Sequence, residues 1–296
     1  MIENRNKPET ANFFWEGPIS NYEIASINSF VKSGFSVNLW TYNQELFSEI
    51  NTEVNIIDAS NILKKDTLYQ LNQNYQKANY SSFSNLFRYK LLETYGGWWF
   101  DSDCFCHKEV DEFVNLTKDR EYVLGLEKEN YVGSAVMYFN DLSLLKKIQE
   151  RAYSVIENKN YRLRWGEIGP DLITETVISE GLINTIFPPD YFFPISPTNI
   201  QALFNSKISI DDKDKINQSF TCHTWNEMFR KYNINKNIHP PKSSYMYHQF
   251  LDNGIVINNE VKIYSQKVIV RFMPFVSIIF KLYSRIRVTI KNYKTT

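Results

Sequence analysis

One stretch, residues 81–107, limits the fold of this chain more than any other. Its first half repeats an apolar residue every four positions, at Phe83, Phe87, Leu91 and Tyr95. That period is typical of one face of a helix, which Ser81 or Ser82 can cap. A Gly-Gly pair then ends the helix, and the apolar run Trp-Trp-Phe at 98–100 is typical of a short buried strand. The stretch therefore predicts a helix, a tight turn and a strand in direct succession.

Two carboxylates, Asp101 and Asp103, come directly after the predicted strand. Like charges this close repel each other, and water solvates them poorly beside a core. A divalent cation removes both problems, and Mg²⁺ or Mn²⁺ prefers carboxylate oxygen while keeping coordination positions open for phosphates. An isolated Asp-x-Asp is more often a plain turn, but the helix, Gly-Gly and strand before this one favour a metal site.

The N-terminal part of the chain alternates strands with helices. Strands are predicted at residues 11–17, 37–42 and 54–58, and a helix begins with a capping box formed by Ser20 and Glu23. This order is typical of an α/β protein with a parallel sheet. Ligands bind such sheets at the carboxyl ends of the strands, which is where the two aspartates would lie.

The central stretch resembles the sugar-nucleotide site of family 32 glycosyltransferases. This family includes capsular-polysaccharide types and is related to the core of the large clostridial glucosylating toxins. The matching residues are Ser84, Asn85, Arg88, Tyr89, Tyr95, Gly96, Gly97, Asp101 and Asp103. The resemblance covers roughly residues 11–230. It implies a nucleotide-sugar (GT-A) fold, with a mixed, mostly parallel central sheet flanked by helices.

The resemblance also implies how a nucleotide-sugar donor is held. Trp15 matches an aromatic residue that stacks on the nucleotide base, and Asn85 and Arg88 would orient the donor sugar. Asn85 stands where the family usually has Asp, so it keeps a hydrogen-bond acceptor but lacks the charge. The catalytic set would be Asp101, Asp103, Asn85 and Arg88, and the donor-binding set Trp15, Asn85, Arg88, Tyr89, Ser102, Glu167, Asp171 and Trp225.

A second informative segment lies around Gly169-Pro170, where a helix is predicted to begin. The family shows a similar Gly-Pro motif whose helix end lies near the bound sugar. Glu167 and Asp171 are therefore candidate partners of sugar hydroxyls. For Asp171, a helix start that favours a negative charge is a sufficient alternative explanation.

The third segment, residues 219–231, contains a His-x-Trp pair. It resembles a late family element that completes the metal or diphosphate site. His223 is thus a candidate third metal ligand beside Asp101 and Asp103, although a single histidine is often only structural. Trp225 would pack there or close over the nucleotide.

Together with these residues, the resemblance implies a retaining, metal-dependent glycosyltransferase. It would move a hexose or N-acetylhexosamine from a UDP-sugar to a hydroxyl of a surface-polysaccharide or lipid-linked acceptor. Two other hypotheses stay open at this point. The same carboxylates could serve a metal-dependent phosphodiesterase of nucleotide sugars, although two-metal hydrolases use more ligands. Asn85 would also fit a non-catalytic relative that only binds the sugar nucleotide.

Composition narrows the partners and the compartment. The formal net charge of zero offers no field for nucleic acid. Three cysteines form no disulfide pattern, and the polar N-terminus does not resemble a signal peptide, so a cytoplasmic protein is expected. The spacing of Cys104, Cys106 and His107 does not match a standard zinc site, which favours small buried thiols. The frequent Asn, Lys and Ile residues suggest a bacterial source.

The C-terminal segment, residues 261–296, differs from the preceding 260 residues. It carries eight Lys or Arg and no Asp or Glu, and its longest uncharged run, 272–280, is too short to span a bilayer. A basic, amphipathic segment of this kind favours the anionic inner face of the plasma membrane. A helix docked on the protein itself is the alternative. The expected organisation is a catalytic domain at 1–260 and a peripheral anchor at 261–296.

Overall fold

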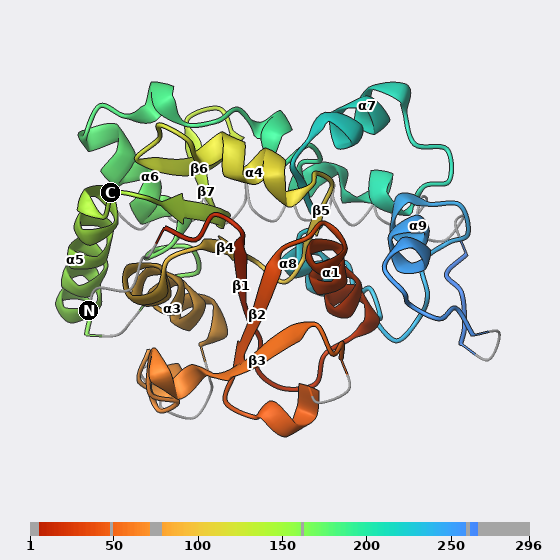
Figure 1. Cartoon of the computed structure of the whole chain (residues 1–296), viewed down its shortest axis with the longest axis horizontal. Helices are drawn as coiled ribbons and strands as arrows, with labels where there is room; N and C mark the ends of the chain where they lie inside the picture. Colours follow the sequence, from red (N-terminus) through yellow and green to blue (C-terminus); the bar gives the residue numbers. More distant parts are fainter. Residues whose placement is uncertain (1–5, 48–49, 72–78, 161–162, 259–260, 266–296) are drawn as a thin grey trace, which may run out of the picture.

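The computed structural model describes residues 6–47, 50–71, 79–160, 163–258 and 261–265 (Figure 1). Six strands form the central sheet in the order β3-β2-β1-β4-β7-β6. Their bounds are β1 Thr10–Phe14, β2 Ser36–Thr41, β3 Val54–Asp58, β4 Trp98–Phe100, β6 Tyr122–Lys128 and β7 Tyr131–Phe139. Strands β1 to β4 pair in parallel, whereas β7 runs antiparallel to both β4 and β6. The sheet is therefore mixed and mostly parallel, which confirms the predicted fold class.

Helices cover both faces of this sheet. Their bounds are α1 Asn21–Lys32, α2 Thr67–Gln70, α3 Tyr80–Tyr95, α4 Val110–Thr117, α5 Ser143–Asn158, α6 Pro170–Ser179, α7 Ile210–Gln218, α8 Asn226–Lys231 and α9 Tyr245–Asp252. Short 3-10 helices are η1 Gln44–Phe47, η2 Ala59–Asn61, η3 Ile183–Thr185, η4 Pro189–Tyr191 and η5 Pro197–Phe204. In Figure 1, α3 and α5 lie on one side of the sheet, and α1 and α9 lie on the other.

Strand β1 shows how each face is filled. Consecutive side chains of a strand point to opposite faces, so Phe13 and Phe14 enter different cores. Phe13 meets Phe30 of α1 with ring centroids 5.1 Å apart, and Phe14 meets Phe87 of α3 at 4.7 Å. Strand β4 alternates in the same way, because Trp98 and Phe100 pack toward α1 while Trp99 packs toward α3.

The two predicted helix starts have different outcomes. Helix α1 begins with the predicted capping box between Ser20 and Glu23. Helix α3 begins two or three residues earlier than a cap at Ser81 or Ser82 would give, and neither serine caps it. Its cap is Asn79, whose side-chain oxygen accepts a hydrogen bond from the Ser82 N–H at 3.2 Å. Asn is as good a cap as Ser, so the sequence alone did not separate the two.

The Gly-Gly turn after α3 is required by both conformation and space. Gly96 and Gly97 have φ angles of 67° and 77°, which favour glycine. A Cβ atom on Gly97 would lie 2.9 Å from the side-chain nitrogen of Asn12 and 2.9 Å from the Thr10 carbonyl oxygen. The turn therefore seats β4 directly against β1, and this contact fixes where Asp101 leaves the sheet.

A second, two-stranded sheet follows the turn at the carboxyl end of β4. It consists of β5, Cys104–Cys106, and β8, Thr221–His223, which run antiparallel. In this register Cys104 pairs with His223. The pairing joins two segments far apart in the sequence and brings His223 next to Asp103.

The C-terminal segment is described only at its beginning. Residues 261–265 lie against the preceding domain, where the Tyr264 N–H donates to the His239 carbonyl oxygen at 2.9 Å. The His239 N–H in turn donates to the Lys262 carbonyl oxygen at 2.9 Å. The expected basic anchor lies almost wholly in residues 266–296, outside the described residues. In the part of the chain that is described, no helix has the length and apolarity needed to cross a membrane.

Candidate active site

Asp101 lies at the carboxyl end of β4, where the strand leaves the sheet. Its N–H donates to the Ala135 carbonyl oxygen at 2.9 Å, which ties the turn to β7. One carboxylate oxygen, Oδ1, accepts a hydrogen bond from the Trp99 indole at 2.8 Å and lies 3.2 Å from the Arg88 guanidinium. The side chain is 28% exposed, so the carboxylate still faces open space.

Asp103 is held by backbone as well as side-chain groups. Its Oδ2 accepts a hydrogen bond from the Asn226 N–H at 2.6 Å, at the start of α8. Its Oδ1 lies 3.1 Å from Nε2 of His223. The Thr224 N–H donates to the Asp103 carbonyl oxygen at 2.8 Å. These contacts fix the carboxylate beside the imidazole.

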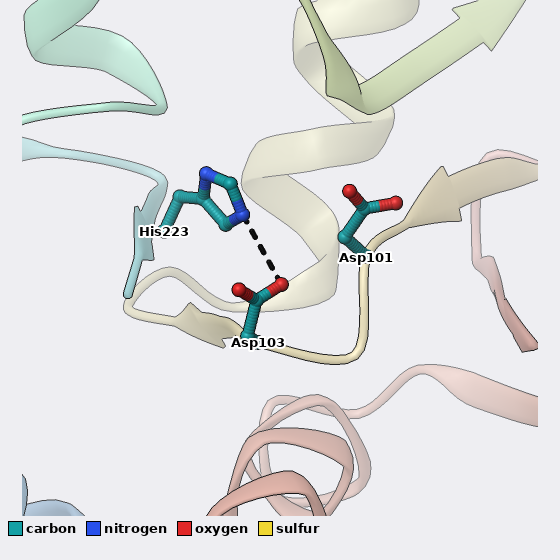
Figure 2. A group of neighbouring side chains, drawn as sticks. All are labelled: Asp101, Asp103 and His223. Atoms are coloured by element: carbon teal, nitrogen blue, oxygen red, sulfur yellow. Dashed lines mark hydrogen bonds and ion pairs between the residues drawn. The ribbon is translucent and has the colours of Figure 1, made fainter. Parts of the chain in front are cut away.

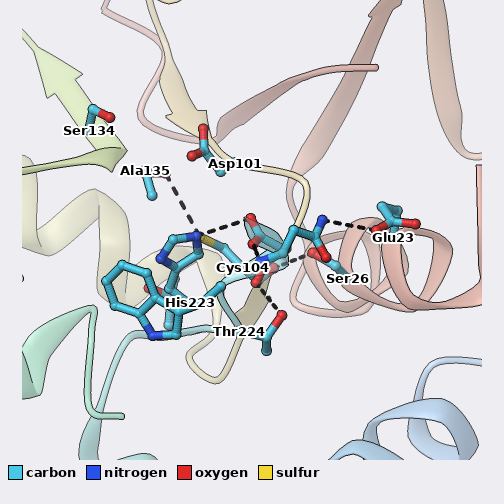
Figure 3. Close-up of polar contacts among 12 residues, drawn as sticks. Glu23, Ser26, Asp101, Cys104, Ser134, Ala135, His223 and Thr224 are labelled. Atoms are coloured by element: carbon cyan, nitrogen blue, oxygen red, sulfur yellow. Dashed lines mark hydrogen bonds and ion pairs between the residues drawn. The ribbon is translucent and has the colours of Figure 1, made fainter. Parts of the chain in front are cut away.

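Helix α1, at the right of Figure 3, packs against the same turn. The Ser26 hydroxyl donates to the Cys104 carbonyl oxygen. The Asn226 side-chain amide donates to the Glu23 carboxylate at 2.9 Å, so one glutamate serves both the α1 capping box and α8. The turn carrying the aspartates is therefore fixed by elements from three parts of the chain, which limits its movement.

Asp101, Asp103 and His223 form one compact group (Figure 2). One ligand atom from each lies within 4.8 Å of the others, and no other such group of His, Cys, Asp or Glu occurs among the described residues. Nδ1 of His223 is buried without a hydrogen-bond partner, so Nε2 is the nitrogen that faces the carboxylates. Two carboxylates and one imidazole are a donor set that fits Mn²⁺ or Mg²⁺.

The electrostatics of this group favour charged forms. Burial alone would raise the pKa of Asp103, but the neighbouring His223 and the Asn226 N–H hold it below its usual range. Burial alone would lower the pKa of His223, but the negative charge of Asp103 raises it above its usual range. In the absence of a metal, the positive charges of His223 and Arg88 therefore offset the two carboxylates, and a metal bound by the His223 nitrogen would take the place of its proton.

The zinc alternative, which the sequence already disfavoured, has no support in this geometry. Cys104, Cys106 and Cys222 are all buried and free, and none belongs to the group of candidate ligands. Burial raises the pKa of Cys106 and of Cys222 to about 12, so both stay protonated thiols. They pack as small apolar residues.

Arg88 is locked in place on α3. Its guanidinium donates to the Ser84 hydroxyl at 3.0 Å and to the Ser134 carbonyl oxygen, and it lies 4.8 Å from the centre of the Trp99 ring. Together with the ion pair to Asp101, these contacts hold a permanent positive charge beside the carboxylates. Asn85 lies one residue along from Ser84 and packs against Gly169 at the start of α6.

All these groups open into a cavity of about 790 Å³, which is large enough for a nucleotide sugar. Eight of the eleven predicted site residues line it: Trp15, Asn85, Arg88, Asp101, Ser102, Asp103, His223 and Trp225. Trp225 packs against its neighbours. Its ring centre lies 4.2 Å from that of His223, and its indole donates to the Ile195 carbonyl oxygen at 2.7 Å.

The other three predicted residues are not in the cavity wall. Tyr89 is fully buried, and its hydroxyl donates to the Ile168 carbonyl oxygen at 2.8 Å. Glu167 is occupied by Arg164, at 3.2 Å, and by Lys159. These residues hold the frame of the site through local ion pairs and hydrogen bonds. Asp171 accepts a hydrogen bond at 2.8 Å from the hydroxyl of Tyr131, which does line the wall.

The structure adds wall residues that the sequence analysis missed. Most important are Glu127 and Tyr131, on the two strands of the β6–β7 hairpin, and Trp165, in the loop before α6. A carboxylate at the end of the apolar run YVLGLE was the available signal for Glu127. The sequence pattern does not show that the Glu127 side chain points into the cavity, because that direction depends on packing against residues far away in the chain.

Two family models match the chain in succession. One, described as "Capsular polysaccharide synthesis protein", matches residues 47–163, and the other, "Alpha 1,4-glycosyltransferase conserved region", matches residues 157–252. The first contains the Asp101 and Asp103 pair, and the second contains His223. Both matches support a glycosyltransferase, and they agree with the resemblance to family 32. This glycosyltransferase is thus an enzyme with a mixed, mostly parallel sheet flanked by helices.

Solved structures similar to this glycosyltransferase are distant. PaToxG glycosyltransferase shares 15% identity over 60% of this chain and 72% of its own, with a TM-score of 0.48. GlyE of Streptococcus pneumoniae shares 13% sequence identity over 88% of this chain and 62% of its own, with a TM-score of 0.43. The bifunctional glycosyltransferase WbbM shares 10% sequence identity over 88% of this chain and 51% of its own, with a TM-score of 0.46. Likenesses at this level carry no conclusion about substrate. No curated protein sequence matches the chain.

Proposed function

We propose that this enzyme is a retaining, metal-dependent glycosyltransferase that uses a UDP-sugar. It transfers a hexosyl or N-acetylhexosaminyl group to a hydroxyl of a surface-polysaccharide or lipid-linked glycan. The observation that supports this best is the convergence of Asp101, Asp103 and His223 within 4.8 Å at the wall of a 790 Å³ cavity.

Each part of the cavity would handle one part of the donor. Asp101, Asp103 and His223 would hold Mn²⁺ or Mg²⁺, which supplies positive charge for the departing diphosphate when bound. Arg88 holds a second positive charge in a fixed place, so it stabilises negative charge without reorganising. Asn85 and Trp15 line the same cavity, where the Asn85 amide would meet the donor sugar and the Trp15 ring would meet the base.

The test is UDP release from a panel of UDP-sugars in the presence of MnCl₂. We expect the Asp101→Asn and Asp103→Asn variants, and the wild type in EDTA, to lose at least about 100-fold in turnover, because each change weakens or removes the cation that would offset the charge of the departing diphosphate. Asp214→Asn, an exposed substitution on α7, is the matched control and should keep full turnover.

Three results would contradict this function. Wild-type turnover in the Asp101→Asn or Asp103→Asn variant would remove the metal assignment. Release of sugar phosphate instead of UDP would point to a phosphodiesterase. An absence of metal-dependent UDP binding by calorimetry would point to a non-catalytic relative. The anomeric form of the product, read by NMR, decides between retention and inversion.

The place of action is proposed from residues 261–296. Their eight Lys or Arg and lack of acidic residues support a peripheral position on the anionic, cytoplasmic face of the plasma membrane. A lipid-linked acceptor would be presented at that surface.

A further inference from the structure

Glu127 lies inside the cavity because of a close fit within the β6–β7 hairpin. It is near the end of β6, and its side chain crosses over Gly133 of β7. A Cβ atom on Gly133 would lie 2.8 Å from Cγ of Glu127 and 2.7 Å from the ring of Phe193. Only glycine therefore leaves room for Glu127 to lie across the strand, and its carboxylate lines the cavity.

Among the described residues, Glu127 is the one carboxylate of the cavity wall that makes no hydrogen bond or ion pair. The other four are all paired. Glu16 accepts from Lys65, Asp101 from Trp99, Asp103 from Asn226, and Glu227 from Arg230. A half-buried carboxylate without a partner is costly, so its retention inside a binding cavity points to a partner that arrives with the substrate.

Another segment of the same cavity wall offers an aromatic surface. Trp165 lines the same cavity and is 63% exposed, which is unusual for a tryptophan. The loop that carries it is tied to the hairpin, because the Tyr131 hydroxyl donates to Asp171 and Asp171 lies 3.8 Å from where a Cβ atom on Gly166 would be. Glu127 and Trp165 thus belong to connected parts of one wall.

This wall is built from other elements than the donor side, although the charges of Asp101, His223 and Arg88 still act on Glu127, and Lys231 of α8 lies 5.7 Å from the centre of the Trp165 ring. The candidate metal ligands and Arg88 come from α3, the β4–β5 turn and β8, whereas Glu127 and Trp165 come from the hairpin and the loop before α6. A nucleotide sugar is a molecule of limited size that lies against the metal. A glycan acceptor extends outward, and an exposed tryptophan at the rim suits a sugar ring that continues into solvent.

We propose that Glu127 and Trp165 form the acceptor subsite, in which Glu127 accepts a hydrogen bond from an acceptor hydroxyl and Trp165 supports the apolar face of a sugar ring. The inference rests on the proposed transferase function and adds the acceptor side to it. Burial raises the pKa of Glu127 to about 7, which agrees with a carboxyl group that has no partner until a hydroxyl binds.

The test compares two reactions of the same enzyme. Donor hydrolysis is UDP release with no acceptor, and transfer is UDP release with p-nitrophenyl hexosides, using the glycoside on which the wild type is fastest. We expect Glu127→Ala and Trp165→Ala to raise the KM for the glycoside about tenfold or more, while donor KM and donor hydrolysis change less than about twofold. Glu127→Gln keeps one acceptor oxygen, so its KM for the glycoside should lie between those of Glu127→Ala and the wild type.

Matched controls lie nearby in the chain. Glu129→Gln changes an exposed carboxylate in the hairpin turn, outside the cavity wall, and Tyr153→Ala removes an exposed aromatic on α5. Both should leave both reactions unchanged. Saturation-transfer NMR of the same glycosides on protein loaded with Mg²⁺ and UDP gives a binding readout that does not need turnover, and melting curves confirm that each variant is folded.

The outcomes separate this inference from the function it rests on. An equal loss in donor hydrolysis and transfer for Glu127→Ala would make Glu127 a donor contact and overturn the inference. Unchanged glycoside KM and unchanged NMR binding would also overturn it. Wild-type protein that releases no UDP from any donor would instead overturn the transferase function, and the acceptor subsite with it.

Discussion

Glu127 is ionised in the unfolded chain at neutral pH but only partly so in the folded one. Burial raises its pKa from 4.5 to about 7, and the charge of Asp101 adds to the shift, while His223, Lys128 and Arg88 oppose it. Between pH 4.5 and about pH 7, the Glu127 carboxyl group is therefore more often protonated in the folded state than in the unfolded state. The protonated Glu127 therefore contributes its full share to the free energy of unfolding below pH 4.5, and this contribution is lost as the pH rises through about 7.

A stability measurement at two pH values checks this sign. In EDTA, wild-type protein should lose about 2 to 3 kcal/mol of unfolding free energy relative to Glu127→Gln between pH 5 and pH 8, since the amide cannot ionise. Urea unfolding followed by circular dichroism gives both values. A difference between the two proteins that does not change with pH would show that Glu127 has an ordinary pKa, and Glu129→Gln serves as the exposed control.

At the scale of single residues, the sequence correctly predicted the position of those site residues that depend on local pattern. Asp101 and Asp103 follow a strand whose ends are readable from glycines and aromatics, so their place at the sheet edge is confirmed. Glu167 carries the same chemistry, but its carboxylate is taken by Lys159 and Arg164. Competition among nearby charges depends on side-chain direction, which a motif does not contain.

At the scale of the element, α6 and α3 meet through one glycine. Helix α6 begins after Gly169 with Pro170 in its first turn, as predicted from the Gly-Pro pair. The close approach to α3 was not predictable, because nothing in the sequence links Gly169 to Asn85. A Cβ atom on Gly169 would lie 2.4 Å from the side-chain nitrogen of Asn85, so the glycine sets where that amide points.

Gly169→Ala should therefore affect both stability and donor use. Overpacking of this kind costs about 1 to 3 kcal/mol, and the displaced amide should raise the KM for the UDP-sugar. Thermal melting and donor-hydrolysis kinetics measure the two effects. The double variant Gly169→Ala/Asn85→Ala should regain most of the stability but not the donor KM. A single variant with wild-type melting and kinetics would contradict the contact.

At the scale of the whole molecule, the first three strands and the helix between β1 and β2 were predictable from alternation alone. The pairing of β5 with β8 was not, because three-residue strands far apart in the chain carry little pattern. Residues 261–296 were predicted as a membrane-surface segment, and that remains a prediction. Its main determinant is charge, which can be tested without knowing the conformation.

Binding to lipid vesicles tests that prediction. The full chain should cosediment with vesicles containing phosphatidylglycerol, less so at high salt, and hardly at all with pure phosphatidylcholine. Replacing four basic residues by Gln should weaken binding by about 100-fold or more, at about 1 kcal/mol per charge. These residues are Arg285, Arg287, Lys291 and Lys294.

The matched control replaces four exposed lysines of the described domain by Gln, at Lys118, Lys146, Lys207 and Lys213. It should bind anionic vesicles as the wild type does. Equal weakening in both variants would mean that overall charge, rather than the C-terminal segment, governs the attraction. Lack of binding by the full chain to anionic vesicles would contradict the membrane position altogether.

The late arrival of β8 has a consequence for biosynthesis. A ribosome that has made the chain through Asp103 must add well over a hundred further residues before His223 can pair across from Cys104. Until then the nascent polypeptide lacks the imidazole and the Asn226 N–H that hold Asp103. Under the proposed function, an incomplete translation product cannot waste cytosolic sugar nucleotides, because its reaction centre closes only when nearly the whole catalytic domain has been synthesised.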